Sequence, residues 1–138
     1  MSSGHLALDI RVLHSPLEKA LLLVHRDLAK NICFFAHESI AHRTFIVALA
    51  NKKIVGMASL AERSHRVPGA MGLCFVSTHL AYRNRGVATA LAGAVFAYAR
   101  AKGKAIANTA YEALGEKHLK PVLTRVALAF PDVALIEH

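Results

Sequence analysis

The stretch HLAYRNRGVATAL, residues 79–91, joins a run typical of a β-strand to an alanine-rich run typical of a helix. Arg83, Arg85 and Gly86 stand at the junction, directly before the expected first helical turn. The N–H groups of such a turn have no partner within the helix, and the helix dipole adds positive charge there. Gly86 and the small Ala88 would let an anion reach these N–H groups without meeting a large side chain. The junction therefore predicts a phosphate-binding site.

A packing role for the glycine is the alternative interpretation of this junction. A strand that leaves a sheet into a helix can use Gly86 merely to bring the two close together, and the motif alone leaves both interpretations open. The sequence contains neither GxxxxGK[ST] nor GxGxxG, which excludes a nucleotide P-loop and a Rossmann fingerprint.

The sequence on either side of the junction alternates strand-like and helix-like runs. The expected elements are a strand over 6–12, a helix from Ser15 to about Phe35, a hairpin of strands over 44–50 and 54–61, a strand over 71–81, and a helix over 84–102 closed by Gly103. Beyond Gly103 we expect a short strand over 104–111, a helix over 116–128 and a strand over 133–138. Pro121 should delay the start of that last helix to about Lys120, or kink it.

Composition limits the class of protein. The chain has 138 residues, of which 54% are hydrophobic and 19% charged, and this indicates one folded domain with a substantial core. Its uncharged runs are too short to span a membrane, and its N-terminus lacks the features of a signal peptide, so we expect a cytoplasmic protein. Cys33 and Cys74 lie in apolar surroundings without CxxC spacing, which favours buried, reduced thiols.

The charge balance points to an anionic partner. Lys and Arg total 17 against 9 Asp and Glu, a formal net charge of +8, which suits nucleic acid, an acidic membrane surface or a polyphosphate cofactor. The basic residues are dispersed along the chain and there is no Trp for base stacking, which disfavours nucleic acid. His37 and His42 are five residues apart rather than the four of a helical zinc motif, so we expect no metal site. His79 alone stands beside the phosphate motif and merits testing.

The stretch around the junction resembles the sequence signature of a known family. RNRGVATAL is similar to the acetyl-CoA signature of the GNAT superfamily of N-acetyltransferases, Arg/Gln-x-x-Gly-x-Gly/Ala, and FVSTHLAY before it resembles that family's fourth strand, which splays from its neighbour. The resemblance implies acetyl-CoA as cofactor and direct attack of an amine on its acetyl group. The implied cofactor-binding residues are Val76, Ser77 and Thr78 at the pantetheine, and Arg83, Asn84, Arg85, Gly86, Val87, Ala88 and Thr89 at the pyrophosphate.

Catalytic residues are less clearly marked in this chain. The family deprotonates the amine through a carboxylate or a water chain, and a tyrosine often protonates the leaving thiolate. No acidic residue lies between Glu62 and Glu112, and alignment of the family's C-terminal motif on Ala129 and Phe130 places Arg125 where that tyrosine would stand. Glu62, Tyr111 and Glu112 are the catalytic candidates, because they lie near ends of strands expected to flank the site. A packing or solvent-facing role is the alternative for each.

Element order and resemblance together predict a GNAT-like α/β (α+β) domain over residues 1–138, with a mixed, mostly antiparallel sheet flanked by helices. The predicted activity is acetyl transfer to a primary amine, and a polyamine, a small-molecule drug, a peptide N-terminus and a lysine side chain all remain open as acceptors. The alternatives are a non-catalytic CoA-binding regulator or interaction module and, less favoured, a basic nucleic-acid-binding domain. An exposed sheet edge predicts pairing with a second copy, and thus a homodimer.

Overall fold

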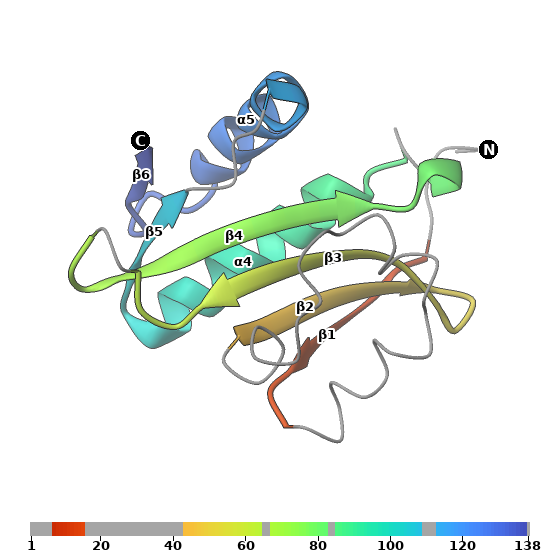
Figure 1. Ribbon diagram of the computed structural model, residues 1–138, viewed down its shortest axis with the longest axis horizontal. Coiled ribbons are helices and arrows are strands. Elements are labelled where there is room, and N and C mark those ends of the chain that lie inside the picture. Colours follow the sequence, from red (N-terminus) through yellow and green to blue (C-terminus); the bar gives the residue numbers. More distant parts are fainter. Residues whose placement is uncertain (1–6, 16–42, 65–66, 83–84, 109–112, 138) are drawn as a thin grey trace.

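A single mixed sheet organises the part of the chain that the computed structural model describes, which is residues 7–15, 43–64, 67–82, 85–108 and 113–137. Its six strands follow one another in sequence order across the sheet (Figure 1). They are β1 (Asp9–Leu13), β2 (Arg43–Ala50), β3 (Lys53–Ala61), β4 (Ala70–Thr78), β5 (Ala105–Asn108) and β6 (Leu135–Glu137). β1 to β4 pair antiparallel, whereas β4, β5 and β6 pair parallel. The predicted mixed, mostly antiparallel α/β fold is confirmed.

Two helices make the crossovers that parallel pairing requires. α4 (Val87–Lys102) connects β4 to β5, and α5 (Ala113–Ala127) connects β5 to β6. The buried residues of α4 recur at spacings of three and four and form one apolar stripe: Val87, Leu91, Ala92, Val95, Phe96 and Ala99. This stripe and the buried side of α5 pack into the same core cluster as the inner face of the sheet.

The β2–β3 hairpin turns through two residues in the left-handed region, Asn51 at φ 50° and Lys52 at φ 67°. Two positive φ values are typical of the tight turn that matches the twist of a hairpin. The hairpin expected around this polar connection is confirmed. Side chains of β2 and β3 are buried on both faces of the sheet, and the face opposite α4 carries a second cluster that includes Phe45, Val47 and Met57.

A bulge in β4 keeps the core face in register near the predicted site. Leu73 pairs with Leu60, whereas Phe75 pairs with Ser59, so Cys74 is the extra residue. Val76, three residues after Leu73, consequently packs against the same core cluster.

Three boundaries predicted from the sequence are wrong. The first strand spans Asp9–Leu13 rather than 6–12. The strand expected to reach residue 81 ends at Thr78, because the carbonyl oxygen of His79 accepts the N–H of Tyr82 and starts a 3₁₀ turn, η1 (Leu80–Tyr82). The helix expected from residue 84 begins at Val87, because the residue before it is a glycine in the left-handed region.

The last helix also differs from its prediction. α5 begins at Ala113, before both expected starting points, and Pro121 lies inside it. Leu119 and Leu123, on either side of the proline, are both buried in the core. We infer that this packing outweighs the hydrogen bond that the proline cannot donate. The expected strands over 104–111 and 133–138 are present as β5 and β6.

Some predictions fall outside the described residues: the helix from Ser15 to Phe35, and the surroundings of Cys33, His37 and His42. Neither helix of the described part combines the length and the hydropathy that a membrane crossing needs.

Candidate functional site

The pairing of β4 with β5 covers the first half of β4. It runs from Ala70 with Ala105 to Leu73 with Asn108, where β5 ends. β4 continues to Thr78 and pairs there with β3, and the arrows of β4 and β5 point in different directions (Figure 1). In the described part of the chain, residues 76–78 therefore have a strand partner on the β3 side only. Such an edge offers backbone N–H and C=O groups to an extended ligand.

α4 begins near the end of β4, and in the described part of the chain no side chain caps its first turn. Gly86, at φ 85° and ψ 5°, is the N-cap residue. The first helical bond runs from the N–H of Ala90 to the carbonyl oxygen of Gly86 over 3.0 Å. The N–H groups of Val87, Ala88 and Thr89 precede that bond. Among the described residues no side-chain cap is made at Gly86, and the first turn contains no acidic residue. A Ser, Thr, Asn or Asp side chain usually caps a helix start, and negative charge is favourable there. Gly86 offers neither, so an external anion can take this place.

Gly86 serves conformation and access rather than packing. A Cβ added to it would meet no atom within 4 Å, so the alternative of close strand-to-helix packing at this residue is wrong. Its φ of 85° is one that residues with a Cβ rarely adopt. The glycine thus creates the left-handed start of the helix and leaves open space in front of the amides.

The glycine that brings strand and helix together is Gly56 of β3. A Cβ there would lie 2.6 Å from Cγ1 of Val87 and 3.1 Å from the carbonyl oxygen of Ser77. The first turn of α4 therefore rests directly on the sheet beside the end of β4. Sequence reasoning missed this role, although an isolated glycine inside a strand pattern is a recognised signal of close approach.

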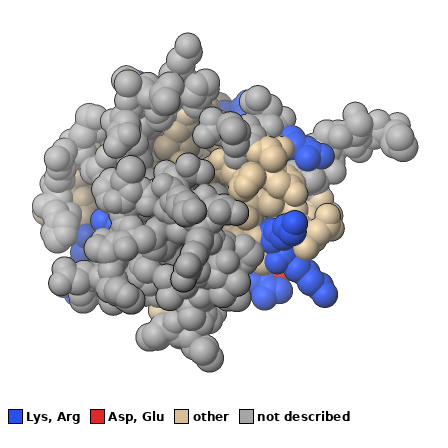
Figure 2. All heavy atoms as spheres, turned by 45° about the vertical axis from the view of Figure 1, so that its right-hand side comes forward, with Lys and Arg blue, Asp and Glu red and all other residues tan. Residues whose placement is uncertain are grey.

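Cationic side chains surround the open turn. The guanidinium carbon of Arg85 lies 5.7 Å from the ring centroid of Tyr82, a cation–π distance. On the α5 side, Nη2 of Arg125 donates a hydrogen bond to Oγ1 of Thr89 over 3.3 Å. Among the described residues that Figure 2 shows on one face of the molecule, the charged side chains are almost all Lys and Arg. At the start of α4, Arg85 and Arg125 make the surroundings favourable for an anion.

His79 shapes the connection between β4 and α4. Its N–H donates to the carbonyl oxygen of Val55 over 2.7 Å, and its Nδ1 accepts the N–H of Ala81 over 3.2 Å. Its ring meets that of Tyr82 edge-on, with 5.9 Å between the centroids. The histidine that the sequence marked for testing thus ends the strand and orders the turn.

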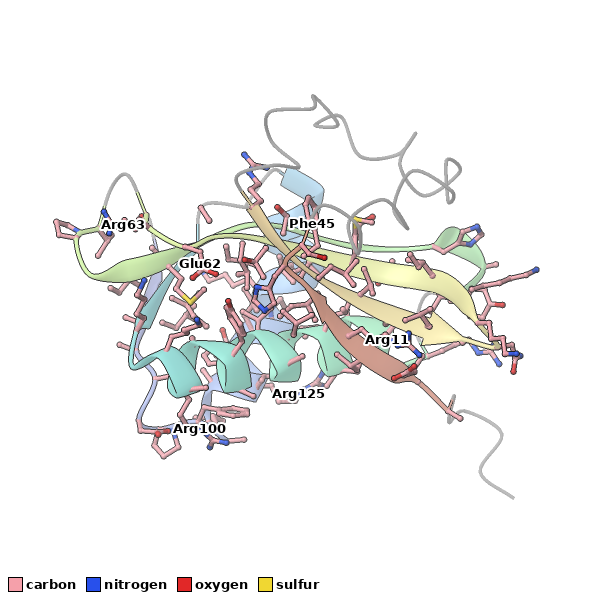
Figure 3. The ribbon with its side chains drawn as sticks, turned by 90° about the horizontal axis from the view of Figure 1, so that it is seen from below. Arg11, Phe45, Glu62, Arg63, Arg100 and Arg125 are labelled. Atoms are coloured by element: carbon pink, nitrogen blue, oxygen red, sulfur yellow. The ribbon has the colours of Figure 1, made fainter. Side chains whose placement is uncertain are left out.

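Glu62 lies at the other end of the sheet, just after β3. One carboxylate oxygen, Oε1, accepts hydrogen bonds from Oη of Tyr98 over 2.6 Å and from Oγ1 of Thr44 over 2.8 Å. Its carbonyl oxygen accepts a bond from Nζ of Lys104 over 2.9 Å. Figure 3 shows its side chain turned toward the half of α4 remote from Gly86. Glu62 thus connects β2, the end of β3, α4 and the start of β5.

The electrostatics of this cluster suit a structural carboxylate. Partial burial by itself would raise the pKa of Glu62, but the hydrogen bonds from Tyr98 and Thr44 and the charges of Lys102 and Lys104 outweigh it and hold that pKa below its ordinary value. Burial, followed by the hydrogen bond to the carboxylate, raises the pKa of Tyr98 to about 12. A carboxylate with a lowered pKa is a weaker base, and a tyrosine with a raised pKa is a weaker acid.

Distance separates this cluster from the open turn. Tyr98 lies twelve residues along α4 from Gly86, or about 18 Å at 1.5 Å per residue. This distance places Glu62 away from the proposed pyrophosphate site, and its two accepted hydrogen bonds support the packing alternative for this residue. The other catalytic candidates, Tyr111 and Glu112, lie outside the described residues, as do Arg83 and Asn84 of the expected cofactor set.

The described residues fit the chemistry of CoA. The open space at Gly86 and the uncapped amides suit a diphosphate, and the edge of β4 suits the extended, amide-bearing pantetheine arm. The structure brings together the strand residues 76–78 and the helix start 85–89, which the sequence had assigned to one ligand.

Comparisons with known proteins agree with this geometry. The Acetyltransferase (GNAT) family matches residues 13–117 of the chain. No curated protein matches its sequence. Among solved structures, the fold is similar to an aminoglycoside acetyltransferase, meta-AAC0020, from an uncultured soil metagenomic sample, with 13% identity, a TM-score of 0.65 and 86% of each chain covered.

Two further structures extend this comparison. The aminoglycoside N-acetyltransferase AAC(6')-Iy in complex with CoA shares 20% identity at a TM-score of 0.64, over 91% of this chain and 90% of that one. A ribosomal-protein-alanine N-acetyltransferase from Brucella melitensis biovar Abortus 2308 shares 19% identity at a TM-score of 0.60, over 83% and 86%. The chain therefore belongs to the GNAT family, as an N-acetyltransferase that takes its acetyl group from acetyl-CoA.

Proposed function

We propose that the protein transfers the acetyl group of acetyl-CoA to a primary amine by direct attack, with the pyrophosphate of the cofactor bound at the start of α4. One observation carries this proposal. Among the described residues, α4 opens on a left-handed glycine without a side-chain cap and with no acidic residue in its first turn, beside the part of β4 that lies beyond its pairing with β5. That combination leaves both a diphosphate site and a strand edge free for one continuous ligand.

The cofactor-binding roles divide between strand and helix. Val76, Ser77 and Thr78 offer backbone groups to the amides of pantetheine, and the N–H groups of 86–89 bind the pyrophosphate. Arg85 adds positive charge beside them. For Arg83 and Asn84 the same assignment rests on their positions in the signature.

Acetyl-CoA supplies an activated thioester, and the chain has to deliver a neutral amine to its carbonyl carbon. The amine nitrogen forms the new C–N bond, the C–S bond breaks, and the departing thiolate takes up a proton. Glu112 and Tyr111 are proposed for the proton transfers on the strength of their sequence position after β5. Glu62 is better suited to positioning α4, because its carboxylate already accepts two hydrogen bonds and its pKa is lowered.

Charge narrows the class of acceptor. The chain carries a formal net charge of +8, so its field repels polycations and slows their encounter with the site. We therefore favour an amine with little additional positive charge, such as the N-terminus of a neutral or acidic peptide. Aminoglycosides and polyamines are the polycationic acceptors to compare with such peptides in the same assay, since aminoglycoside acetyltransferases share the fold.

The decisive experiment measures CoA binding and thiol release separately. Calorimetry with CoA should show saturable binding, and acetyl-CoA hydrolysis without an amine sets the background for thiol release. An amine panel should then raise the rate above that background, with mass spectrometry locating the acetyl group on the product. Binding without release for any amine would favour a non-catalytic CoA-binding module. Absence of CoA binding would overturn the proposal altogether.

A further inference from the structure

Arg125 near the C-terminal end of α5 makes a contact that the established activity does not require. Its Nη2 donates a hydrogen bond to Oγ1 of Thr89 over 3.3 Å, across 36 positions of sequence. Thr89 belongs to the first turn of α4, among the residues whose N–H groups have no side-chain cap. The guanidinium is therefore held within one helical turn of the open amides.

This placement is electrostatically unfavourable unless an anion is bound. The start of a helix carries partial positive charge, and a cation near it is destabilising. The first turn of α4 has no acidic residue to balance Arg125, and the salt bridge between Asp9 and Arg11 lies at another part of the molecule. Arg85 adds a second cation just before the turn. Two phosphoryl groups would supply the missing negative charge.

We propose that Arg125 is a ligand of the cofactor's pyrophosphate and so couples α5 to the bound cofactor. A guanidinium can donate two parallel hydrogen bonds to phosphate oxygens, which suits it to this task. The assignment is to the pyrophosphate rather than the 3′-phosphate because Thr89 shares its turn with the amides proposed for the pyrophosphate. This inference rests on the proposed function, which places the cofactor there.

The proposal also excludes one chemical role for this residue. Arginine stays protonated throughout the accessible pH range and is not an exchangeable acid. The family resemblance places Arg125 where a proton-donating tyrosine would stand. Because arginine does not donate that proton, Arg125 contributes to cofactor binding instead. Its loss should raise KM for acetyl-CoA and leave kcat nearly unchanged, since it holds the cofactor equally in the ground and transition states.

The experiment compares Arg125→Gln with Arg100→Gln, a matched control that removes the same charge from an exposed arginine whose guanidinium lies 4.8 Å from the ring centroid of Phe130. Calorimetry uses three probes: CoA, dephospho-CoA without the 3′-phosphate, and pantetheine without any phosphate. A charge-assisted contact predicts that Arg125→Gln weakens CoA and dephospho-CoA by the same factor, about tenfold. Pantetheine should be unaffected, Arg100→Gln should stay within about twofold of wild type, and Arg125→Lys should fall between.

Each other outcome contradicts a defined part of the reasoning. A loss confined to CoA would assign Arg125 to the 3′-phosphate and overturn the pyrophosphate contact. Unchanged affinity for both nucleotides, or a fall in kcat without a rise in KM, would overturn the binding role. If wild type itself fails to bind CoA, the proposed function fails first. Circular dichroism melts of all three variants show whether the fold is retained.

Discussion

Replacing Gly86 by Asp and by Asn tests the cofactor site with two side chains of nearly equal size that differ in charge. Both residues tolerate the left-handed region better than other residues with a Cβ, and a Cβ at this position would meet no atom within 4 Å. The strain from φ 85° is therefore similar in the two variants and cancels in their comparison. What remains is the effect of one negative charge at the start of α4.

The charge should act in opposite directions on folding and on binding. A carboxylate at a helix start interacts favourably with the helix dipole by about 0.3–1 kcal/mol, so the Asp variant should be at least as stable as the Asn variant. The same carboxylate about 5 Å from a phosphate charge repels it by about 0.8 kcal/mol in water and about 3 kcal/mol at an effective dielectric constant near 20. Because Gly86 is exposed to solvent, the repulsion of about 0.8 kcal/mol calculated for water applies, and it corresponds to about a fourfold rise in the Kd for CoA.

The assay pairs urea unfolding with calorimetry of CoA binding at low and high salt. We expect the Asp variant to unfold at equal or higher urea and to bind CoA at least about fourfold more weakly than the Asn variant, with the difference shrinking as salt rises. Pantetheine should bind both variants alike. Equal affinity of the two variants for CoA would refute a phosphate at this helix start, whatever their stabilities.

Four further predictions follow from the packing, the charges and the sheet edge. Gly56→Ala should destabilise the fold by about 1–3 kcal/mol and weaken CoA binding, because its Cβ would displace Val87. Adding Val87→Ala should restore part of the CoA affinity, and no restoration would contradict the close approach of α4 to β3 at Gly56. The unfolding free energy should fall as pH rises from about 10 to about 12, because the folded protein holds the Tyr98 proton up to a higher pH than the unfolded chain does. Tyr98→Phe should remove this part of the pH dependence. An unchanged pH profile would argue against the Tyr98–Glu62 hydrogen bond. CoA affinity should decline as added salt shortens the electrostatic screening length to about 8 Å. An affinity that does not change with salt would indicate that contacts with the β4 edge, rather than charge, account for most of the binding. Light scattering at micromolar concentration should show a homodimer, and a monomer would remove the sheet-edge prediction.

Local features of the chain were predictable because their causes are local. The hairpin follows from two apolar runs around a polar turn, and the helix over 87–102 follows from apolar spacing closed by Gly103. The glycine at the start of this helix was visible for the same reason, since it is a property of neighbouring residues, and the phosphate site that it suggests stays a prediction. Boundaries failed where a single backbone state decided them, as at Gly86, whose left-handed φ delays the helix to Val87.

The role of Glu62 shows what sequence reasoning cannot supply. Its position after a strand made it a candidate base, yet its carboxylate accepts a hydrogen bond from Tyr98, which lies 36 positions away. That contact depends on how α4 lies across the sheet. The lowered pKa of Glu62 follows from the same neighbours and was equally hidden.

The sequence by itself determined the order of strands and helices around residues 43–108 and a glycine-led helix start at Gly86, because these depend on side-chain periodicity and on the φ preference of glycine. Only the tertiary structure decided which glycine packs, which carboxylate is already occupied and which distant arginine reaches the open turn. Gly56, Glu62 and Arg125 acquire these roles through the packing of α4 against the sheet and α5. Contacts of that kind join residues far apart in the chain, and no local pattern encodes them.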